Sequence, residues 1–423
     1  MKNPRNVYVV GSRRTPFAKS GQQLRAVTRL ELLTAPLRAL REDHRLEAPL
    51  GDVALGALLN SSSQWNLARE SVLEAGLHPY TPAYNVQRAC GTSLETTLQI
   101  AAKIALGQIE DGIAGGVDTN SDLPVEVSED LRGLLKELHV AKTIGERLRV
   151  LAKLRPAFLL PKAANVVEAR TGLSMGEHCE KMVKEWKISR LEQDEIALAS
   201  HRHAVRAYAD GFYSNLLVPV AGLDRDAFPR ADTSLERLAK LKPVFDTSGA
   251  GTLTAGNSSP LTDGAAAVLL ASETRARERG WTPLARFVDA QASAVDFVGG
   301  DGLLMAPTVA VAQLLRRNGL RLQDFDYYEI HEAFAGQVAC TLKAWESDEY
   351  CRRYGEAGAL GSIDRAKLNV VGSSVALGHP FAATGARIVG TLAKLLSQKP
   401  GIRGLISICT AGGMGVAAIL EAP

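Results

Sequence analysis

The sequence is poor in cysteine, and its cysteines form no pattern that would indicate a disulfide framework or a paired metal site. Five of the 423 residues are cysteines, scattered without a CxxC pair at Cys90, Cys179, Cys340, Cys351 and Cys409. An odd number of isolated cysteines in a chain of this length indicates free thiols and a reducing compartment. We therefore expect a cytoplasmic protein.

Long apolar runs are also absent. No stretch of about 18 apolar residues occurs, so we expect no membrane-spanning helix. The first residues, MKNPRNVYVVGSRRTPF, lack an apolar stretch followed by a cleavage site and are too few before the first expected strand for a typical transit peptide, so we expect no targeting segment. The net charge of +3 is too small to indicate a nucleic-acid partner.

Several common ligand motifs are missing. The run GAGTLTAG at 249–256 is not GxGxxG, and no GxxxxGK[ST] occurs, so NAD and P-loop sites lack support. The zinc motif HExxH fails at His331, because Ala335 stands at its fifth position. We expect neither a bound metal nor a cofactor.

Strand-like apolar runs alternate with helical patterns along much of the chain. Strands are expected at 7–10, 51–59, 112–117, 284–294, 327–330 and 405–408, and helices at 31–40, 93–106, 307–317 and 383–396. This alternation predicts an α/β fold with a mostly parallel sheet.

The two ends of the chain resemble each other. Residues 85–90 and 369–377 each lead into a helix, and each half then has a strand and a glycine pair, at 115–116 and 412–413. General similarity of α/β units is the alternative explanation. We expect two similar βαβ-type halves and an inserted helical loop domain, with limits at 1–120 plus 245–275, 121–244, and 276–423.

The expected insertion is charged and helical. Ser128 and Thr143 precede two helical patterns, and Ser128 is followed by acidic residues that suit a helix start. Residues 131–162 contain eight Lys or Arg against two Glu, a balance of +6. A solvated helical face is one explanation, and a contact with an anionic membrane or a partner subunit is the other.

Four side chains that could carry chemistry follow strand-like runs. Cys90, in NVQRACGTS, opens a helix whose positive end should lower its pKa and favour the nucleophilic thiolate. Cys409 precedes a glycine-rich turn and could act as acid or base. His379, in GHPFAATGAR, and His331, in HEAFAGQ, also lie where open α/β sheets build sites. A structural cysteine and satisfied core histidines are the alternatives.

Six segments together resemble the thiolase superfamily over nearly the whole chain. They are SRRTPF at 12–17, RACGTSLET around Cys90, TAGNSSPLTDGAAA at 254–267, HEAFAGQ at 331–337, GHPFAATGAR at 378–387 and CTAGGMG at 409–415. The resemblance implies a layered α-β-α-β-α core. Most thiolases have Asn where this chain has His331 and Gly where it has Ala411. Those two residues and the insertion at 121–185 resemble the β-subunits of fatty-acid β-oxidation trifunctional complexes.

The resemblance also implies a mechanism and a substrate, coenzyme A. His379 would accept the proton of Cys90, whose thiolate would attack the 3-keto carbon of a 3-ketoacyl-CoA. Cys409 would protonate the departing acetyl-CoA enolate and then deprotonate CoA. One oxyanion hole would use His379 and a water held by His331. The other would use the backbone N–H groups of Cys90 and Ala411.

The remaining implied contacts concern CoA and partner proteins. Arg230 would lie near the nucleotide end of CoA, although a solvated surface charge is the alternative. Met175 and Ser259 would lie along the pantetheine arm, and Ala333 and Phe334 would line the tunnel. A homodimer or dimer of dimers is expected, with a hydratase/dehydrogenase α-subunit or a membrane as further candidate partners.

Three other classes of protein share some of these features. A ketoacyl synthase also combines one Cys with two His, but it lacks the second cysteine represented here by Cys409. A non-catalytic acyl-CoA-binding protein would be expected to lose a catalytic residue, and a thioesterase would need a water-activating carboxylate. Within the superfamily, a biosynthetic acetoacetyl-CoA thiolase is the alternative to the degradative 3-ketoacyl-CoA thiolase, which the insertion and His331 favour.

Overall fold

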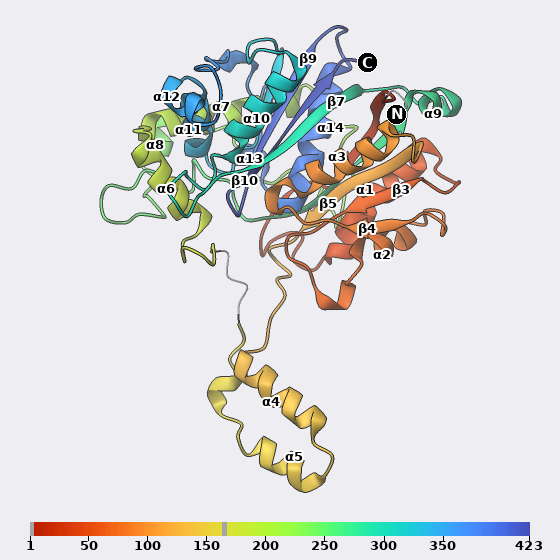
Figure 1. Cartoon of the computed structure of the whole chain (residues 1–423), viewed down its shortest axis with the longest axis vertical. Coiled ribbons are helices and arrows are strands. Elements are labelled where there is room, and N and C mark those ends of the chain that lie inside the picture. The colour runs from red at the N-terminus through yellow and green to blue at the C-terminus, as the bar shows by residue number, and fades with distance from the viewer. Residues whose placement is uncertain (1–3, 163–166) are drawn as a thin grey trace.

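The computed structural model describes residues 4–162 and 167–423. One 10-stranded sheet runs through the molecule in the order β4-β3-β5-β6-β1-β7-β10-β9-β8, with β2 paired to β6 (Figure 1). The strands are β1 (Val7–Arg14), β2 (Ala18–Lys19), β3 (Asp52–Leu55), β4 (Ala83–Asn85), β5 (Asp111–Asp118), β6 (Thr262–Ser272), β7 (Ala285–Ala294), β8 (Tyr327–Ile330), β9 (Arg403–Thr410) and β10 (Met414–Glu421).

The sheet is mixed, so the expectation of a mostly parallel sheet is wrong. β3 runs parallel to β4 and β5, and β8 runs parallel to β9. The pairs β1–β6, β5–β6, β1–β7, β7–β10, β9–β10 and β2–β6 are antiparallel. The difference arises largely because the sequence pattern missed β6 and β10, which take part in most of these antiparallel pairs. β6 is buried along its whole length and rich in alanine, so it lacks the polar–apolar alternation of a half-exposed strand.

Two similar halves make up this sheet. The order β3-β5-β6-β1 in the first half is matched by β8-β9-β10-β7 in the second, with one parallel pair followed by antiparallel pairs in each. Pairing between β1 and β7 joins the halves. The two glycine pairs are not equivalent, because 115–116 lies inside β5 whereas 412–413 lies in the turn between β9 and β10. The expected equivalence of the two glycine pairs is therefore wrong.

Helices form three layers around the sheet. α3 (Thr92–Ala105) and α14 (Thr384–Leu396) share a core with strands of both halves and form the middle layer. α1 (Arg29–His44) and α2 (Leu67–Glu74) cover the outer face of the first half. α10 (Ala306–Asn318) and α11 (Ala335–Trp345) cover that of the second. The α-β-α-β-α core expected from the sequence is therefore present.

The two central helices lie unusually close together near their N-termini. A Cβ atom on Gly385 would lie 2.2 Å from the backbone nitrogen of Leu94, so only glycine fits there. The Ser93 hydroxyl accepts a hydrogen bond from the Ala386 N–H at 2.8 Å. Both helices begin at this contact. The residues that precede them, which are far apart in the sequence, therefore lie close together in space.

The segment between the halves has two parts. α4 (Glu129–Val140) and α5 (Ile144–Leu151) form a hairpin that stands away from the body (Figure 1). Ser128 and Thr143 are their N-caps, as expected. α6 (Met175–Glu185), α7 (Arg190–Ala209) and α8 (Leu235–Ala239) instead pack into the core of the second half. The residue limits of the three expected domains stay predictions.

The remaining short helices are peripheral or lie next to the site. They are α9 (Glu273–Arg279), α12 (Asp348–Arg353) and α13 (Ser374–Leu377). Across 4–162 and 167–423, no helix combines the length and the apolar character that crossing a membrane requires.

Candidate active site

Cys90 lies in a strained turn immediately before α3. Its neighbour Ala89 has φ 43°, a left-handed conformation that is rare for residues with a side chain and costs about 1–3 kcal/mol. The Thr92 hydroxyl secures the turn, because it accepts a hydrogen bond from the Arg88 N–H at 2.8 Å and donates one to the Ala89 carbonyl at 2.7 Å. The turn therefore holds the thiol at the start of the central helix.

His379 occupies the corresponding position before α14. Gly378 has φ 99°, and a side chain there would collide with Phe228. The His379 backbone N–H donates to the Thr262 hydroxyl at 3.0 Å, which ties this loop to β6. His379 Nε2 lies 3.1 Å from Cys90 Sγ, and its Nδ1 lies 2.6 Å from Thr384 Oγ1. With the proton on Nδ1 donated to Thr384, Nε2 is free to accept the thiol proton.

Burial keeps both members of this pair neutral. Burial raises the pKa of the Cys90 thiol to about 12, and Asp118 adds to the rise, while hydrogen bonds from the amides of Ala411 and Cys90 itself lower it. Burial also lowers the pKa of His379 to about 3, with a further contribution from Arg387. The pKa of Cys90 is therefore raised, and the lowered pKa expected from the helix N-terminus is wrong. Proton transfer to His379 must accompany attack by the sulfur.

A cavity of about 290 Å³ opens onto this pair. It is lined by Cys90, Ser174, Met175, Gly176, Phe245, Ser259, Pro260, Leu261, Leu304, Ala333, Phe334, His379, Phe381, Cys409 and Ala411. Cys409, at the end of β9, has its pKa raised well above the usual value by burial and by the nearby Cys90. A second thiol thus faces the same space as the first, held as a neutral acid.

His331 lies behind the cavity wall, at the end of β8. Its ring centroid is 4.2 Å from that of His379, and its Nδ1 is 2.8 Å from Ser374 Oγ. Ligand atoms of Cys90, His331 and His379 all lie within 4.8 Å of one another. Zinc accepts such sulfur and imidazole donors, so this trio could hold a metal. The expectation that no metal is bound remains a prediction.

The candidate CoA residues fall into two places. Met175, Ser259, Ala333 and Phe334 all line the cavity of Cys90, and the Ser259 hydroxyl donates to the Ala333 carbonyl at 2.8 Å. Arg230 is exposed and lines a neighbouring cavity of about 210 Å³ instead. Pro260 borders both cavities, so the two spaces adjoin.

Sequence reasoning missed several residues that shape the site. Phe381 lines the cavity and packs edge-on against His379, with ring centroids 5.3 Å apart. Phe381 and Thr384 fall inside GHPFAATGAR, so that motif could have indicated them. No sequence motif indicated Asp118. Its buried carboxylate accepts hydrogen bonds from backbone N–H groups of both halves, including those of Leu58 and Ala382. Cys179, Cys340 and Cys351, which fall in none of the motifs, are buried.

Comparisons with known proteins agree with this architecture. Family models described as the thiolase N-terminal and C-terminal domains match residues 7–274 and 281–422. A 3-ketoacyl-CoA thiolase from Pectobacterium carotovorum subsp. carotovorum is 41% identical over 97% of this chain and 95% of the relative. One from Pseudoalteromonas atlantica is 39% identical over 98% and 96%.

Solved structures give the same result. The acetyl-CoA acetyltransferase of Bacillus anthracis superimposes with a TM-score of 0.83 at 31% identity, covering 100% of both chains. The Ascaris suum Acat5 thiolase in complex with coenzyme A gives a TM-score of 0.80 at 25% identity, covering 99% of this chain and 100% of the other.

The layered fold and these similarities define an enzyme of the acyltransferase class. Within that class, the chain belongs to the thiolase family and has thiolase function.

Proposed function

We propose that this thiolase works in the degradative direction of fatty-acid β-oxidation, as a 3-ketoacyl-CoA thiolase. It would cleave a 3-ketoacyl-CoA with CoA to give acetyl-CoA and a shortened acyl-CoA. The observation that carries this proposal is the convergence of the Cys90–His379 pair and Cys409 on one cavity. Relatives named 3-ketoacyl-CoA thiolase at about 40% identity favour the longer-chain substrate class.

The first half of the proposed reaction forms an acyl-enzyme. The Cys90 proton moves to His379 Nε2 as the sulfur attacks the 3-keto carbon. The negative oxygen formed on that carbon accepts hydrogen bonds from the amides of Cys90 and Ala411. Support comes from the same two amides, which already donate to the sulfur and would lie beside any atom bonded to it. A side chain at 411 does not alter this backbone donor.

Carbon–carbon cleavage then releases an enolate. The bond between C2 and C3 breaks, the acyl group stays on Cys90, and the electron pair passes to the acetyl-CoA thioester as its enolate. His379, now protonated, and His331 stabilise the enolate oxygen. Cys409 supplies the proton that C2 needs, a role suited to a thiol whose high pKa keeps it protonated.

Thiolysis completes the cycle. The Cys409 thiolate takes the proton of incoming CoA, and the CoA thiolate attacks the acyl carbon. Cys90 leaves as a thiolate and recovers its proton from His379. CoA would reach Cys90 past Met175, Ser259, Ala333 and Phe334, with its nucleotide end in the adjoining cavity near Arg230. CoA is then a substrate, and the cycle requires no cofactor.

A thiolysis assay across chain lengths tests the proposal. Acetoacetyl-CoA and 3-ketoacyl-CoAs of increasing length are compared by kcat/KM in the presence of CoA. The degradative assignment requires efficient cleavage of the longer substrates. Activity confined to acetoacetyl-CoA would instead support the biosynthetic alternative, which the likeness to an acetyl-CoA acetyltransferase keeps open. Tight acyl-CoA binding without turnover would identify a binding protein.

We also propose that the α4–α5 hairpin contacts an anionic membrane surface. The hairpin exposes large apolar side chains, including Val140 at 73%, Ile144 at 78% and Leu148 at 61%. These lie among the cations of the segment with the +6 charge balance. An amphipathic, basic helical surface of this kind suits the interface of anionic lipids. The hairpin stands away from the body of the protein, where its surface is free to meet a membrane (Figure 1).

Vesicle pelleting tests this contact. The protein should pellet with vesicles of phosphatidylserine and phosphatidylcholine but not with phosphatidylcholine alone. R147Q/R149Q should weaken binding about 30-fold, at about 1 kcal/mol for each of the two cations removed. R277Q/R279Q, which removes two exposed arginines from α9, is the matched control. Absence of binding at low and high salt would rule out the membrane and favour a protein partner, such as a hydratase/dehydrogenase α-subunit.

Self-association is proposed at the edge of the first half. β4 is an edge strand, and the aromatic residues Trp65 and Tyr80, which precede it in the chain, are 84% and 82% exposed. Exposed edges with aromatic neighbours commonly form interfaces. Light scattering should give the mass of a homodimer or a dimer of dimers, and W65S/Y80S should reduce it. A monomeric wild type would contradict this.

The five free cysteines support a reducing compartment, the cytoplasm.

A further inference from the structure

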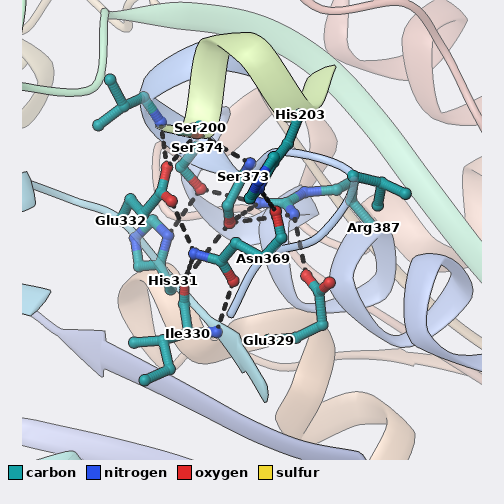
Figure 2. Close-up of polar contacts among 12 residues, drawn as sticks. Ser200, His203, Glu329, Ile330, His331, Glu332, Asn369, Ser373, Ser374 and Arg387 are labelled. Carbon is teal, nitrogen blue, oxygen red and sulfur yellow. Dashed lines mark hydrogen bonds and ion pairs between the residues drawn. The ribbon is translucent and has the colours of Figure 1, made fainter. Parts of the chain in front are cut away.

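His331 has one ring nitrogen paired and the other unpaired. Nδ1 contacts Ser374 Oγ at 2.8 Å, whereas the buried Nε2 has no hydrogen-bond partner in the part of the chain that the structure describes. Figure 2 shows the imidazole beside Ser374 within a dense polar network. Leaving a buried polar atom unpaired costs about 1–3 kcal/mol, so the arrangement calls for a functional explanation.

Ser374 decides which nitrogen of His331 carries the proton. Its oxygen accepts a hydrogen bond from Arg387 Nη2 at 2.7 Å, and a guanidinium can only donate. The hydroxyl hydrogen therefore needs an acceptor. His331 Nδ1 is the acceptor within reach among the described residues. Because Nδ1 then accepts, the proton of the neutral imidazole lies on Nε2, the unpaired atom.

Arg387 is itself held in place inside the protein. Its side chain is buried on α14, and the Glu329 carboxylate lies 4.0 Å away on β8 (Figure 2). Arg387 also contacts the Ser373 hydroxyl at 3.4 Å. Burial lowers the pKa of His331 well below the usual value, and the nearby His379 and Arg387 contribute. The ring is thus neutral and carries a single N–H proton, on either Nδ1 or Nε2.

We propose that Ser374, oriented by Arg387, is a positioning residue that fixes His331 as its Nε2–H tautomer. His331 then donates toward the thioester oxygen of the enolate, directly or through one water, beside the proton that His379 carries after the first step. The Nε2–H has no hydrogen-bond partner among the described residues, and its hydrogen bond to the thioester oxygen strengthens as that oxygen becomes negative. An interaction of this kind stabilises the transition state selectively. The inference rests on the proposed function, because it assigns His331 to the enolate.

Separate half-reactions test the assignment. Exchange of the C2 hydrogens of acetyl-CoA with solvent deuterium, followed by mass spectrometry, reports enolate formation. Exchange of the acetyl group between acetyl-CoA and isotopically labelled CoA reports attack at Cys90, which uses the amides of Cys90 and Ala411. S374A should slow deuterium exchange about 10- to 100-fold, the size expected for a misdirected oxyanion donor. Acetyl exchange and the KM for acetyl-CoA should change less than about 3-fold.

Matched variants separate positioning from packing. S373A removes the neighbouring hydroxyl that also contacts Arg387 but not His331, and should leave deuterium exchange unchanged. S374T keeps a hydroxyl and should restore most of the lost rate. In an H331N background, S374A should have no further effect, because an asparagine amide donates without the help of Ser374.

The outcomes are distinguishable. A wild-type enzyme that performs neither thiolysis nor acetyl exchange would overturn the proposed function itself. An active wild type in which S374A slows both half-reactions equally, or neither, would overturn the role of Ser374 alone. If S374A does not fold, as judged by its thermal transition, failure of S374T to retain wild-type deuterium exchange would likewise reject the proposal.

Discussion

Cys90 Sγ and His379 Nε2 lie 3.1 Å apart, although 289 positions separate them in the chain. Cys90 lies in the turn just before α3, and His379 lies in the loop that leads into α14. These two central helices meet where Gly385 allows the backbone of Leu94 to approach. The two halves of the fold thus contribute one member each to the nucleophile–base pair. A substitution at Gly385 would separate the pair without touching either side chain.

Replacing the nucleophile should abolish thiolysis. Cys90→Ser keeps the volume of the side chain but substitutes a hydroxyl, which is a far weaker nucleophile beside a neutral imidazole. CoA-dependent loss of 3-ketoacyl-CoA should fall by at least about 10³-fold while the thermal transition stays near that of the wild type. Cys351→Ser, at a buried thiol that is not among the residues lining the cavity, is the control for the chemical change alone. Unchanged turnover in Cys90→Ser would remove that residue from its proposed role.

The second thiol should be needed for proton transfer at C2. Cys409→Ala should lower both cleavage and condensation by about 10²- to 10⁴-fold, the usual range for a lost acid or base. Acyl transfer from acetyl-CoA to Cys90 should be slower, because Cys409 no longer protonates the leaving CoA, but mass spectrometry after long incubation should still detect an acetyl group on the variant. If the variant lost acylation as well as turnover, Cys409 would be needed for the structure of the cavity, and the specific role in proton transfer at C2 would be contradicted.

The resting thiol should be protonated across the physiological range. Burial raises the pKa of Cys90 to about 12, so no thiolate should form in the free enzyme between about pH 6 and 9. The measurement is the ultraviolet absorbance of thiolate, taken as the difference between the wild type and Cys90→Ser at each pH. A thiolate signal that saturates near neutral pH would support instead the lowered pKa that the helix N-terminus suggests.

A buried histidine should make stability depend on pH. Burial, and next Arg230, lower the pKa of His201 to about 4. The unfolded chain therefore binds more protons at this site between about pH 4 and 6.5, and the stabilisation present above that window is lost as pH falls through it. The slope is up to about 1.4 kcal/mol per pH unit.

Urea unfolding at several pH values checks this sign. His201→Gln should flatten the pH dependence of the unfolding free energy in that window, while His139→Gln, at an exposed position on α4, should leave it unchanged. Equal slopes in the wild type and His201→Gln would contradict the prediction.

Much of the fold could be read from local patterns. The expected strand 327–330 coincides with β8, and the expected helix 383–396 differs from α14 by one residue. Both segments have strong periodicity or clear boundaries. β6 was missed because burial on both faces removes alternation, and its alanines also suit a helix. The expectation of a mostly parallel sheet was wrong largely for the same reason, since five of the six antiparallel pairs involve β6 or β10, which the sequence pattern missed.

The sequence by itself determined the chemical types at the site, because thiols and imidazoles at strand ends and helix starts are specified by local motifs. It also determined the family, since six motifs in order are retained along the chain. Only the tertiary structure decided the protonation states, because the pKa of Cys90 depends on burial by residues distant in sequence. It likewise decided that His331 is oriented by Ser374 and Arg387, because hydrogen bonds across the packed core follow distance in space and leave no local pattern.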